Sequence, residues 1–284
     1  MKKSWTLILL STVTLLLFMA GCSKNPFFED KKIGSNKREI SGTVQLSDQS
    51  TPDNVFVWLE GFNLSTRTDS LGKFTLTLPT PAAQPGGGLD GIFKLYFYVA
   101  NYDLSSAQVV VHGGQLESAD SDLDDKGELK TTQTLSRRLR IQVAVTPSAI
   151  SAIDSVGIDI AVILQADHEP VVVRFPKMLG NNIAAIFLRD IDPANNYMRM
   201  IDNAGYLTKV ETVGTKSREW HMIINYSLSM FPVGEYEVIP YLFIEQENIP
   251  AELSAALGTG IEDFSESYLK IPFKRQGGRL TIFK

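Results

Sequence analysis

Residues 40–46 read ISGTVQL and residues 55–59 read VFVWL. In both stretches an apolar side chain recurs at every second position, the period that places such side chains on one face of a β-strand. The opposite face of the second stretch carries two aromatic residues, Phe56 and Trp58. These two strands predict that the folded part of the chain begins with a β-sheet.

A tight turn is predicted at residues 69–72, which read DSLG. The Asp69 carboxylate can accept hydrogen bonds from backbone N–H groups, and Gly72 can adopt a positive φ at little cost. Apolar residues at alternate positions resume at Phe74. The pattern therefore predicts a turn between two strands of one module.

The order of these features resembles the carboxypeptidase regulatory-like domain, a transthyretin-like sandwich. The resemblance covers roughly residues 38–116, and it departs from the family at Asn101, where glycine is usual. Because this module is attached to peptidases, receptors, adhesins and transporters alike, the resemblance implies a fold and no particular activity. The residues that carry it are Ile40, Gly42, Val44, Val55, Val57, Leu59, Thr68, Asp69, Gly72 and Phe74.

The first 22 residues have the pattern of an export signal. Lys2 and Lys3 precede a mostly apolar run at residues 7–18, and small residues lead to Cys22, the only cysteine. The segment resembles a bacterial lipoprotein signal peptide, with Met19 where leucine is usual. The resemblance implies cleavage before Cys22, diacylglycerol on its thiol and further acylation of the new amino terminus.

An uncleaved membrane anchor, or an ordinary secretory signal with Cys22 as a buried thiol, is the alternative interpretation. The position of the lone cysteine directly after the apolar run favours the lipoprotein, and two kinds of anchor make membrane attachment stable. By resemblance to enterobacterial sorting, where Asp at the next position retains lipoproteins in the inner membrane, Ser23 favours the outer membrane. Which side of that membrane the protein faces is left open.

Composition limits the class of partner. Removing residues 1–21 also removes Lys2 and Lys3 and changes the formal net charge from -5 to -7. An acidic chain argues against nucleic acid, because phosphate contacts need clustered Lys and Arg. With 44% hydrophobic residues the chain can form packed cores.

The pattern divides the chain into five parts. Residues 1–21 are the signal peptide, and residues 22–38, polar and charged, are a flexible lipidated tether. Residues 39–117 form the regulatory-like sandwich, residues 118–136 an acidic linker, and residues 137–284 a second, Ig-like sandwich. The predicted fold class is therefore all-β, with two tandem β-sandwich modules.

The second module is predicted from strand-like segments at regular spacing. A short helix at residues 250–257 begins with Pro250 and ends before Gly258. Residues 232–236 resemble the tight entry into a late strand of Ig-like domains. The predicted strands are residues 139–145, 156–164, 171–175, 183–188, 206–213, 220–226, 236–244, 268–273 and 280–283.

Aromatic residues are a candidate ligand site. Phe56 and Trp58 lie opposite the apolar face of one strand, and Tyr96 and Tyr98 lie opposite that of another. If the two strands share a sheet, the four side chains can form an exposed platform for stacking on a sugar or a partner protein. Contact with the second module, or ordinary scattered aromatics, is the interpretation that we favour.

Two motifs match part of a ligand-binding pattern, but their surroundings in the sequence do not fit it. Asp120, Asp122 and Asp124 are alternate carboxylates that suit calcium, but the loop lacks the EF-hand glycine and glutamate, which favours a solvated acidic loop. Residues 86–91 read GGGLDG and satisfy the dinucleotide pattern, yet a proline-rich loop precedes them and a β-rich run follows. We predict no metal and no cofactor.

The sequence contains no recognised catalytic motif. His112, His168 and His221 are scattered, and the chain has no G-x-S-x-G or H-E-x-x-H motif. We therefore predict a noncatalytic outer-membrane lipoprotein that acts as a binding, adhesion or assembly module, with an envelope protein or glycan as partner. A glycan-binding surface lipoprotein that uses the aromatic platform is the alternative, and a hydrolase with an unrecognised carboxylate pair is the third reading.

Overall fold

The structure is a computed structural model that describes residues 38–177, 182–202 and 207–284. Residues Arg38–Lys284 form one compact unit, separate from Met1–Lys37. The predictions for the signal peptide, Cys22 and residues 22–37 of the tether lie outside the described residues. Within the described part of the chain, no helix has the length and apolar character needed to cross a lipid bilayer.

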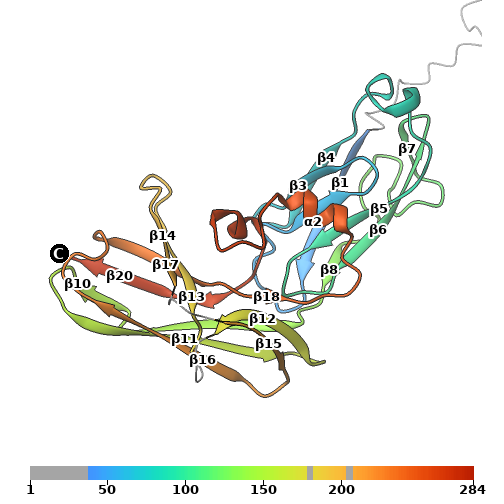
Figure 1. Cartoon of the computed structure of the whole chain (residues 1–284). Helices are drawn as coiled ribbons and strands as arrows, with labels where there is room; N and C mark the ends of the chain where they lie inside the picture. Colours follow the sequence, from blue (N-terminus) through green and yellow to red (C-terminus); the bar gives the residue numbers. More distant parts are fainter. Residues whose placement is uncertain (1–37, 178–181, 203–206) are drawn as a thin grey trace, which may run out of the picture. The chain divides into compact units, whose positions relative to one another are not determined.

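The described chain is all-β, and its first half forms a β-sandwich of two sheets (Figure 1). The sheets have the strand orders β4-β1-β8 and β3-β2-β5-β6-β7. Short 3-10 turns η1 (Pro81–Ala83) and η2 (Pro85–Gly87) precede β5, so the glycines at 86–91 lead into a strand and not into a helix. The strands are β1 (Glu39–Leu46), β2 (Phe56–Leu59), β3 (Leu64–Arg67), β4 (Lys73–Thr77), β5 (Gly91–Tyr98), β6 (Ser105–His112), β7 (Gln115–Glu117) and β8 (Gln133–Leu135).

The first core consists of the apolar side chains that alternate along these strands, as the sequence predicts. Ile40, Val44 and Leu46 of β1 are buried, together with Val55, Val57 and Leu59 at β2. Fully burying each such side chain contributes about 1.5–3 kcal/mol. The period of two therefore identifies the inner face of the first sandwich correctly.

The DSLG turn has the predicted geometry. The Asp69 carboxylate accepts hydrogen bonds from the N–H groups of Leu71 and Lys73, both at 2.9 Å, and Gly72 has a φ of 77°. The Val44 N–H donates to the Gly72 carbonyl at 2.9 Å. A Cβ atom at Gly72 would lie 2.1 Å from the carbonyl oxygen of Val44, so the position requires glycine both for its φ and for this close approach to β1.

A second turn of the same kind lies within residues 118–136. Asp124 accepts hydrogen bonds from the N–H groups of Lys126 and Glu128, both at 2.9 Å, and Gly127 has a φ of 84°. The Gly127 carbonyl accepts a hydrogen bond from Ser41 on β1. Two D-x-x-G turns therefore contact the same strand, one through Gly72 and one through Gly127.

The prediction of a linker at residues 118–136 is wrong, because this segment belongs to the first sandwich. Leu123, Leu129 and Leu135 join its core, and β8 pairs in parallel with β1. Leu123, Leu129 and Leu135 are spaced six residues apart. The charged residues between them made the segment resemble a solvated linker in the sequence. The first core ends at Leu135 and the second begins at Leu139.

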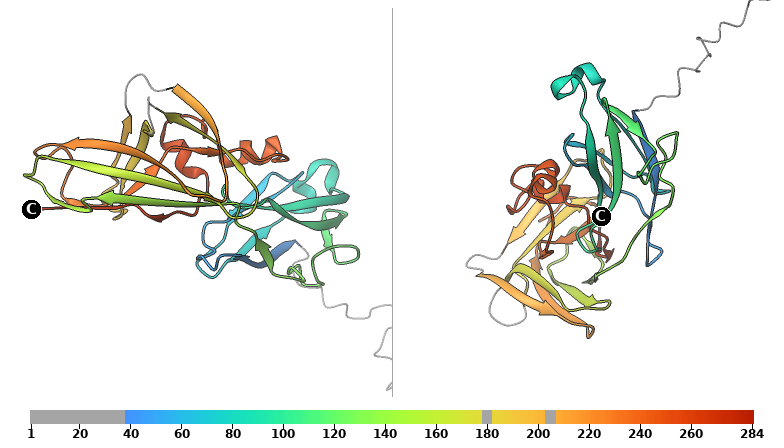
Figure 2. Two further views of the ribbon diagram at one scale, coloured as in Figure 1. Left: turned by 90° about the horizontal axis from the view of Figure 1, so that it is seen from below. Right: turned by 90° about the vertical axis from the view of Figure 1, so that its right-hand side faces the viewer.

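The second half forms another β-sandwich, drawn in yellow-green to red in Figure 2. Its sheets have the orders β10-β20-β17-β13-β14, β16-β11-β9-β19 and β15-β12-β18. The strands are β9 (Leu139–Thr146), β10 (Ala149–Ser151), β11 (Val156–Ala166), β12 (Val171–Lys177), β13 (Ala185–Asp190), β14 (Met198–Asp202), β15 (Leu207–Val213), β16 (Arg218–Tyr226), β17 (Gly234–Pro240), β18 (Phe243–Ile244), β19 (Gln276–Gly277) and β20 (Arg279–Phe283).

Tyr236 closes the entry into β17 that the sequence identified. Its side chain is buried, and its hydroxyl donates to the Pro232 carbonyl, four residues upstream, at 2.8 Å. A buried tyrosine bonded to backbone just upstream is a feature of immunoglobulin-type sandwiches.

The helix α2 (Ala251–Leu257) ends before Gly258, as predicted, but it begins one residue later than predicted, because Pro250 is its N-cap. Residues 268–273, predicted as a strand, include instead part of the 3-10 turn η3 (Glu266–Lys270). Its Tyr268 is fully buried. The apolar residues that suggested a strand are there because this irregular segment is buried against neighbouring elements.

Candidate functional site

The four predicted platform aromatics share one face of the first sandwich. In the pairing of β2 with β5, Phe56 lies opposite Tyr98 and Trp58 opposite Tyr96. The rings of Trp58 and Tyr96 stack with centroids 5.7 Å apart. The sequence therefore identified correctly both the sheet and the face on which these aromatics lie.

That face is not exposed, so the four aromatics form no exposed platform; they contact the second module, which is the interpretation favoured from the sequence. Trp58 is only 1% exposed, and the other three aromatics are at most 9% exposed. They pack in one cluster with residues of β13, β17, α2 and η3, which belong to the second half of the chain. We call this buried cluster the junction core. Its buried members are Phe56, Trp58, Tyr96, Tyr98, Ala100, Ala185, Phe187, Ile239, Tyr241, Leu253, Leu257, Tyr268 and Ile271.

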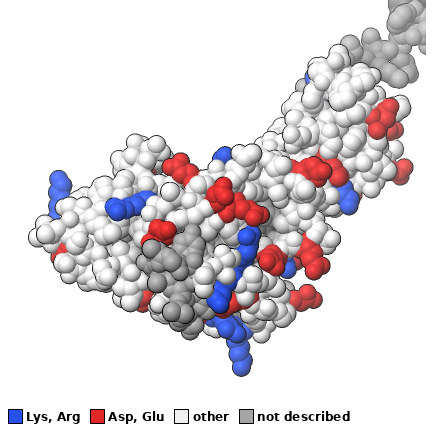
Figure 3. Space-filling view, viewed as in Figure 1, with Lys and Arg blue, Asp and Glu red and all other residues white. Residues whose placement is uncertain are grey.

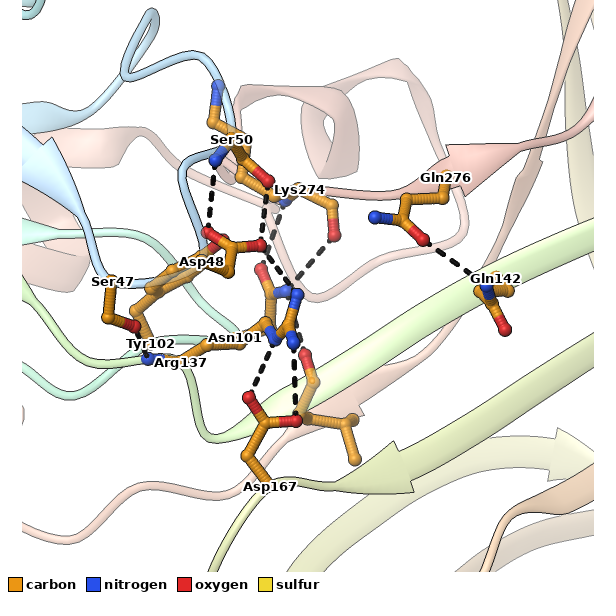
Figure 4. A network of polar contacts seen from close by, with 11 residues as sticks. Ser47, Asp48, Ser50, Asn101, Tyr102, Arg137, Gln142, Asp167, Lys274 and Gln276 are labelled. Atoms are coloured by element: carbon orange, nitrogen blue, oxygen red, sulfur yellow. Dashed lines mark hydrogen bonds and ion pairs between the residues drawn. The ribbon is translucent and has the colours of Figure 1, made fainter.

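Arg137 forms a buried polar network beside the junction core (Figure 4). Its Nη1 lies 2.5 Å from Asp48 of the first sandwich, and its Nε lies 2.8 Å from Asp167 of the second. Its backbone N–H donates to Ser47 Oγ at 3.0 Å, and Tyr102 donates to Asp48 at 2.9 Å. One guanidinium therefore joins a carboxylate from each sandwich.

The network changes the pKa values of its members. Burial alone would raise the pKa of Asp48, but hydrogen bonds from Ser50 and Tyr102 and the charge of Arg137 outweigh it and lower that pKa. Burial and the bond to Asp48 raise the pKa of Tyr102. For Arg137, burial acts to lower the pKa, but Asp167 and Asp48 raise it overall. Asp48 and Arg137 are therefore both charged at neutral pH.

Asn101 is a second buried polar contact across the junction. Its side-chain N–H group donates to the carbonyls of Leu139 and Lys274, both at 3.0 Å, and its oxygen accepts from the Lys274 N–H at 3.0 Å. Asn101 is fully buried. The sequence singled out Asn101 only through a resemblance, and its role depends on partners that lie 38 and 173 positions away along the chain.

A cleft of about 370 Å³ opens next to the network, with residues of both sandwiches in its wall. We call it the junction cleft. It is lined by Asp48, Ser50, Thr51, Asp53, Tyr102, Arg137, Arg140, Ile141, Glu237, Phe273, Lys274, Arg275 and Gln276.

Most charges of the junction cleft are paired. Lys274 lies 2.6 Å from Asp53, Glu237 pairs with Arg189 outside the cleft, and Arg137 pairs as described above. The remaining cations are Arg140 and Arg275, for which the described residues supply no carboxylate. The cleft can therefore receive an additional anion without displacing an existing ion pair.

A wider cleft of about 960 Å³ has the opposite charge balance. Its wall includes two internal ion pairs, Arg138 with Asp103 at 3.4 Å and Arg174 with Glu262 at 3.2 Å. Three further carboxylates, those of Glu169, Glu245 and Glu247, also line it. On the face drawn in Figure 3, Lys and Arg form small separate groups among Asp and Glu.

The other sequence candidates stay apart from this site. His112 is 81% exposed and lies 3.1 Å from Asp90, and His221 lies 3.0 Å from Asp159. His168 is exposed. None of the three histidines lines the junction cleft.

The calcium candidates have other roles. The carboxylate of Asp122 accepts the N–H of Gln108 at 2.6 Å, and that of Asp124 holds a turn. Asp120 provides a backbone carbonyl to Gln108. Across the described ranges, no three His, Cys, Asp or Glu side chains gather to hold a metal ion.

Comparison with known proteins finds a distant likeness among solved structures. No protein-family model and no curated protein matches this chain. Among solved structures it is similar to a variant of BcpA, the major pilin subunit of Bacillus cereus, with 10% identity and a TM-score of 0.27 over 73% of this chain and 66% of the pilin chain. The match to BcpA itself has 10% identity and a TM-score of 0.23 over 71% and 63%. In both cases the chain spans less than two thirds of the pilin's length, and the likeness says nothing about what this chain binds.

Proposed function

We propose that this chain is a noncatalytic lipoprotein of the bacterial outer membrane, anchored through acyl chains on Cys22, that acts as a binding, adhesion or assembly module. The sequence of residues 1–23 supports the anchor. The first sandwich is proposed to be a carboxypeptidase regulatory-like domain and the second an Ig-like one. An envelope protein or glycan is the proposed class of partner.

The junction core is the observation that carries the proposal. Domains within one chain move relative to each other unless their interface is large and apolar. Here large side chains such as Trp58, Tyr268 and Phe187 are buried in one shared cluster, and Arg137 and Asn101 add polar contacts beside it. The two sandwiches therefore share a buried apolar interface within one compact unit, which suits a module that presents fixed surfaces at the end of a tether.

The polar groups of the junction support a role without catalysis. Arg137 has carboxylates on two sides, and Lys274 is held by Asp53. These charges are engaged in joining the sandwiches. The glycan-binding alternative loses its original basis, because the aromatics on which it depended are buried.

Fractionation of cells that express the full chain tests the anchor. The wild-type protein is expected in the outer-membrane fraction, with an acylated Cys22 peptide in mass spectrometry, whereas Cys22→Ala should be released from that fraction. Ser35→Ala, in the same polar segment, is the matched control and should behave as wild type. An uncleaved N-terminus, or outer-membrane retention of Cys22→Ala, would overturn the proposed anchor.

Binding is tested separately with Arg38–Lys284, the compact unit. Immobilised on a surface, it should retain a defined envelope protein or polysaccharide from isolated outer membranes. Heat-unfolded protein on the same surface is the control. Equal retention by folded and unfolded protein would count against a binding module.

A further inference from the structure

The unpaired arginines of the junction cleft have buried donor atoms that lack partners. Among the described residues, the side-chain atoms buried without a hydrogen-bond partner are Nε of Arg140 and Nε of Arg275. Buried donors are nearly always satisfied in folded proteins, and exceptions need an explanation. Both of these atoms belong to residues that line the same cleft.

Arg140 lies on β9, and Arg275 directly precedes β19, the strand that pairs with β9. The pairing joins Gln276 of β19 in parallel to Gln142 of β9. The Arg275 guanidinium lies 4.4 Å from the centre of the Phe273 ring, and its Nη2 lies 3.4 Å from the Tyr268 hydroxyl. Arg275 is therefore held in place by contacts that leave its Nε free.

We propose that the junction cleft binds a small ligand through an oxyanion, a carboxylate or a phosphate group, that is held by Arg140 and Arg275. This deepens the binding role proposed above and rests on it. A guanidinium presents N–H donors in a planar fork that matches the two oxygens of such a group. The volume, about 370 Å³, lies near the lower limit of small-molecule sites and suits a ligand of monosaccharide size.

The charge balance supports an anion over a neutral ligand. The chain as a whole is acidic, with a formal net charge of -5. In this cleft, however, the carboxylates of Asp48, Asp53 and Glu237 are each already paired with a cation. The two remaining positive charges therefore stand out from an acidic background and lie in a partly enclosed space, where charge–charge attraction is stronger than in open solvent.

Calorimetric titration of Arg38–Lys284 tests the proposal with three probes: inorganic phosphate, D-glucuronate and D-glucose. Glucuronate differs from glucose by its carboxylate, so it separates the anionic group from the sugar ring. We expect saturable binding of phosphate, glucuronate or both, and no binding of glucose. Preference for phosphate or for glucuronate identifies which oxyanion the cleft takes.

Arg140→Gln and Arg275→Gln keep the length of the side chain but remove its charge, and each should weaken binding about tenfold or more. Arg218→Gln, at an exposed position of β16 away from the cleft, is the matched control and should bind as wild type. Melting without ligand shows which variants are folded. If one cleft variant fails to fold, the other, together with the wild-type titration, still decides.

Three results would overturn the proposal: no saturable binding of either anion by the wild type at about 10 mM, equal binding by the wild type and a folded cleft variant, or equal binding of glucose. Because the titration uses protein without residues 1–37, its outcome is independent of the anchor. If the cleft binds an anion but Cys22 in the full chain is not acylated, the anion-site proposal holds and the anchor proposal fails. Acylation without anion binding would do the reverse.

Discussion

The side-chain amide of Asn101 and the backbone of Lys274 form a two-point contact, with Nδ2 donating to the Lys274 carbonyl and Oδ1 accepting from the Lys274 N–H, each at 3.0 Å. The two residues are 173 positions apart in sequence. The Asn101 side chain, from the first sandwich, therefore makes with the Lys274 backbone the two hydrogen bonds that a neighbouring strand would otherwise make. The contact makes the junction specific as well as apolar.

Asn101→Ala should lower the free energy of unfolding by about 2–4 kcal/mol, because it leaves buried backbone groups of Leu139 and Lys274 without partners. Urea denaturation of Arg38–Lys284 measures the change. Asn225→Ala, at an exposed position of β16, is the control and should shift stability by less than about 0.5 kcal/mol. Equal effects of the two substitutions would contradict the importance of the contact.

Gly72→Val should destabilise the protein by about 2 kcal/mol or more, since it combines a positive φ with a Cβ that would lie 2.1 Å from the carbonyl of Val44. The midpoint of urea denaturation is expected to fall accordingly. Gly214→Val is the control, because nothing lies within 4 Å of a Cβ there. An unchanged midpoint for Gly72→Val would show that the turn tolerates a side chain.

Trp58→Ala should lower the melting temperature of the whole Arg38–Lys284 unit, because its side chain is buried in the junction core and not in a ligand site. Truncating a buried tryptophan typically costs about 3–5 kcal/mol. Phe283→Ala, at a position that is 50% exposed, should change stability far less. A stable Trp58→Ala protein would show that the junction core is not needed to hold the sandwiches together.

Acid should weaken the Arg137 network. The folded-state pKa of Asp48 is lowered, so the unfolded chain binds protons more readily and this contribution to stability is present above about pH 4, the unfolded value, and is lost as pH falls below it. Urea denaturation at a series of pH values should show this loss. Asp48→Asn should make stability depend less on pH in the same range, and an unchanged pH profile would contradict the prediction.

The sequence predicted the elements better than it predicted their neighbours. Alternation along residues 40–46 and 55–59 identified the strands, the inner face and the shared face of Phe56 and Trp58, because those properties depend on local period. The same alternation does not identify what covers this aromatic face, so the sequence left an exposed platform open beside the favoured contact with the second module. Likewise, the acidic residues around Asp124 masked the turn and the leucines that attach this segment to β1.

The candidate site was beyond sequence reasoning for a physical reason. Asp48, Arg137 and Asp167 are ordinary surface residue types, and only the pairing of distant strands brings them together. Arg140 lies on β9, and Arg275 lies just before β19, which pairs with β9 at the edge of one sheet. No sequence spacing predicts that the three residues of the Arg137 network, or the two arginines of the cleft, belong to one site.

The long separation between Asn101 and Lys274 in the sequence also imposes a delay during synthesis, because the two residues leave the ribosome at different times. Ribosomes add about 5–20 residues per second, so about 9–35 s pass between the emergence of Asn101 and that of Lys274, 173 residues later. During that interval the first sandwich has its own core but an uncovered aromatic face, the kind of surface that draws nascent chains into aggregates. The yield of this protein should therefore depend on the speed of translation. It should also depend on chaperones that cover the aromatic face until the elements of the second half that pack on it have been synthesised.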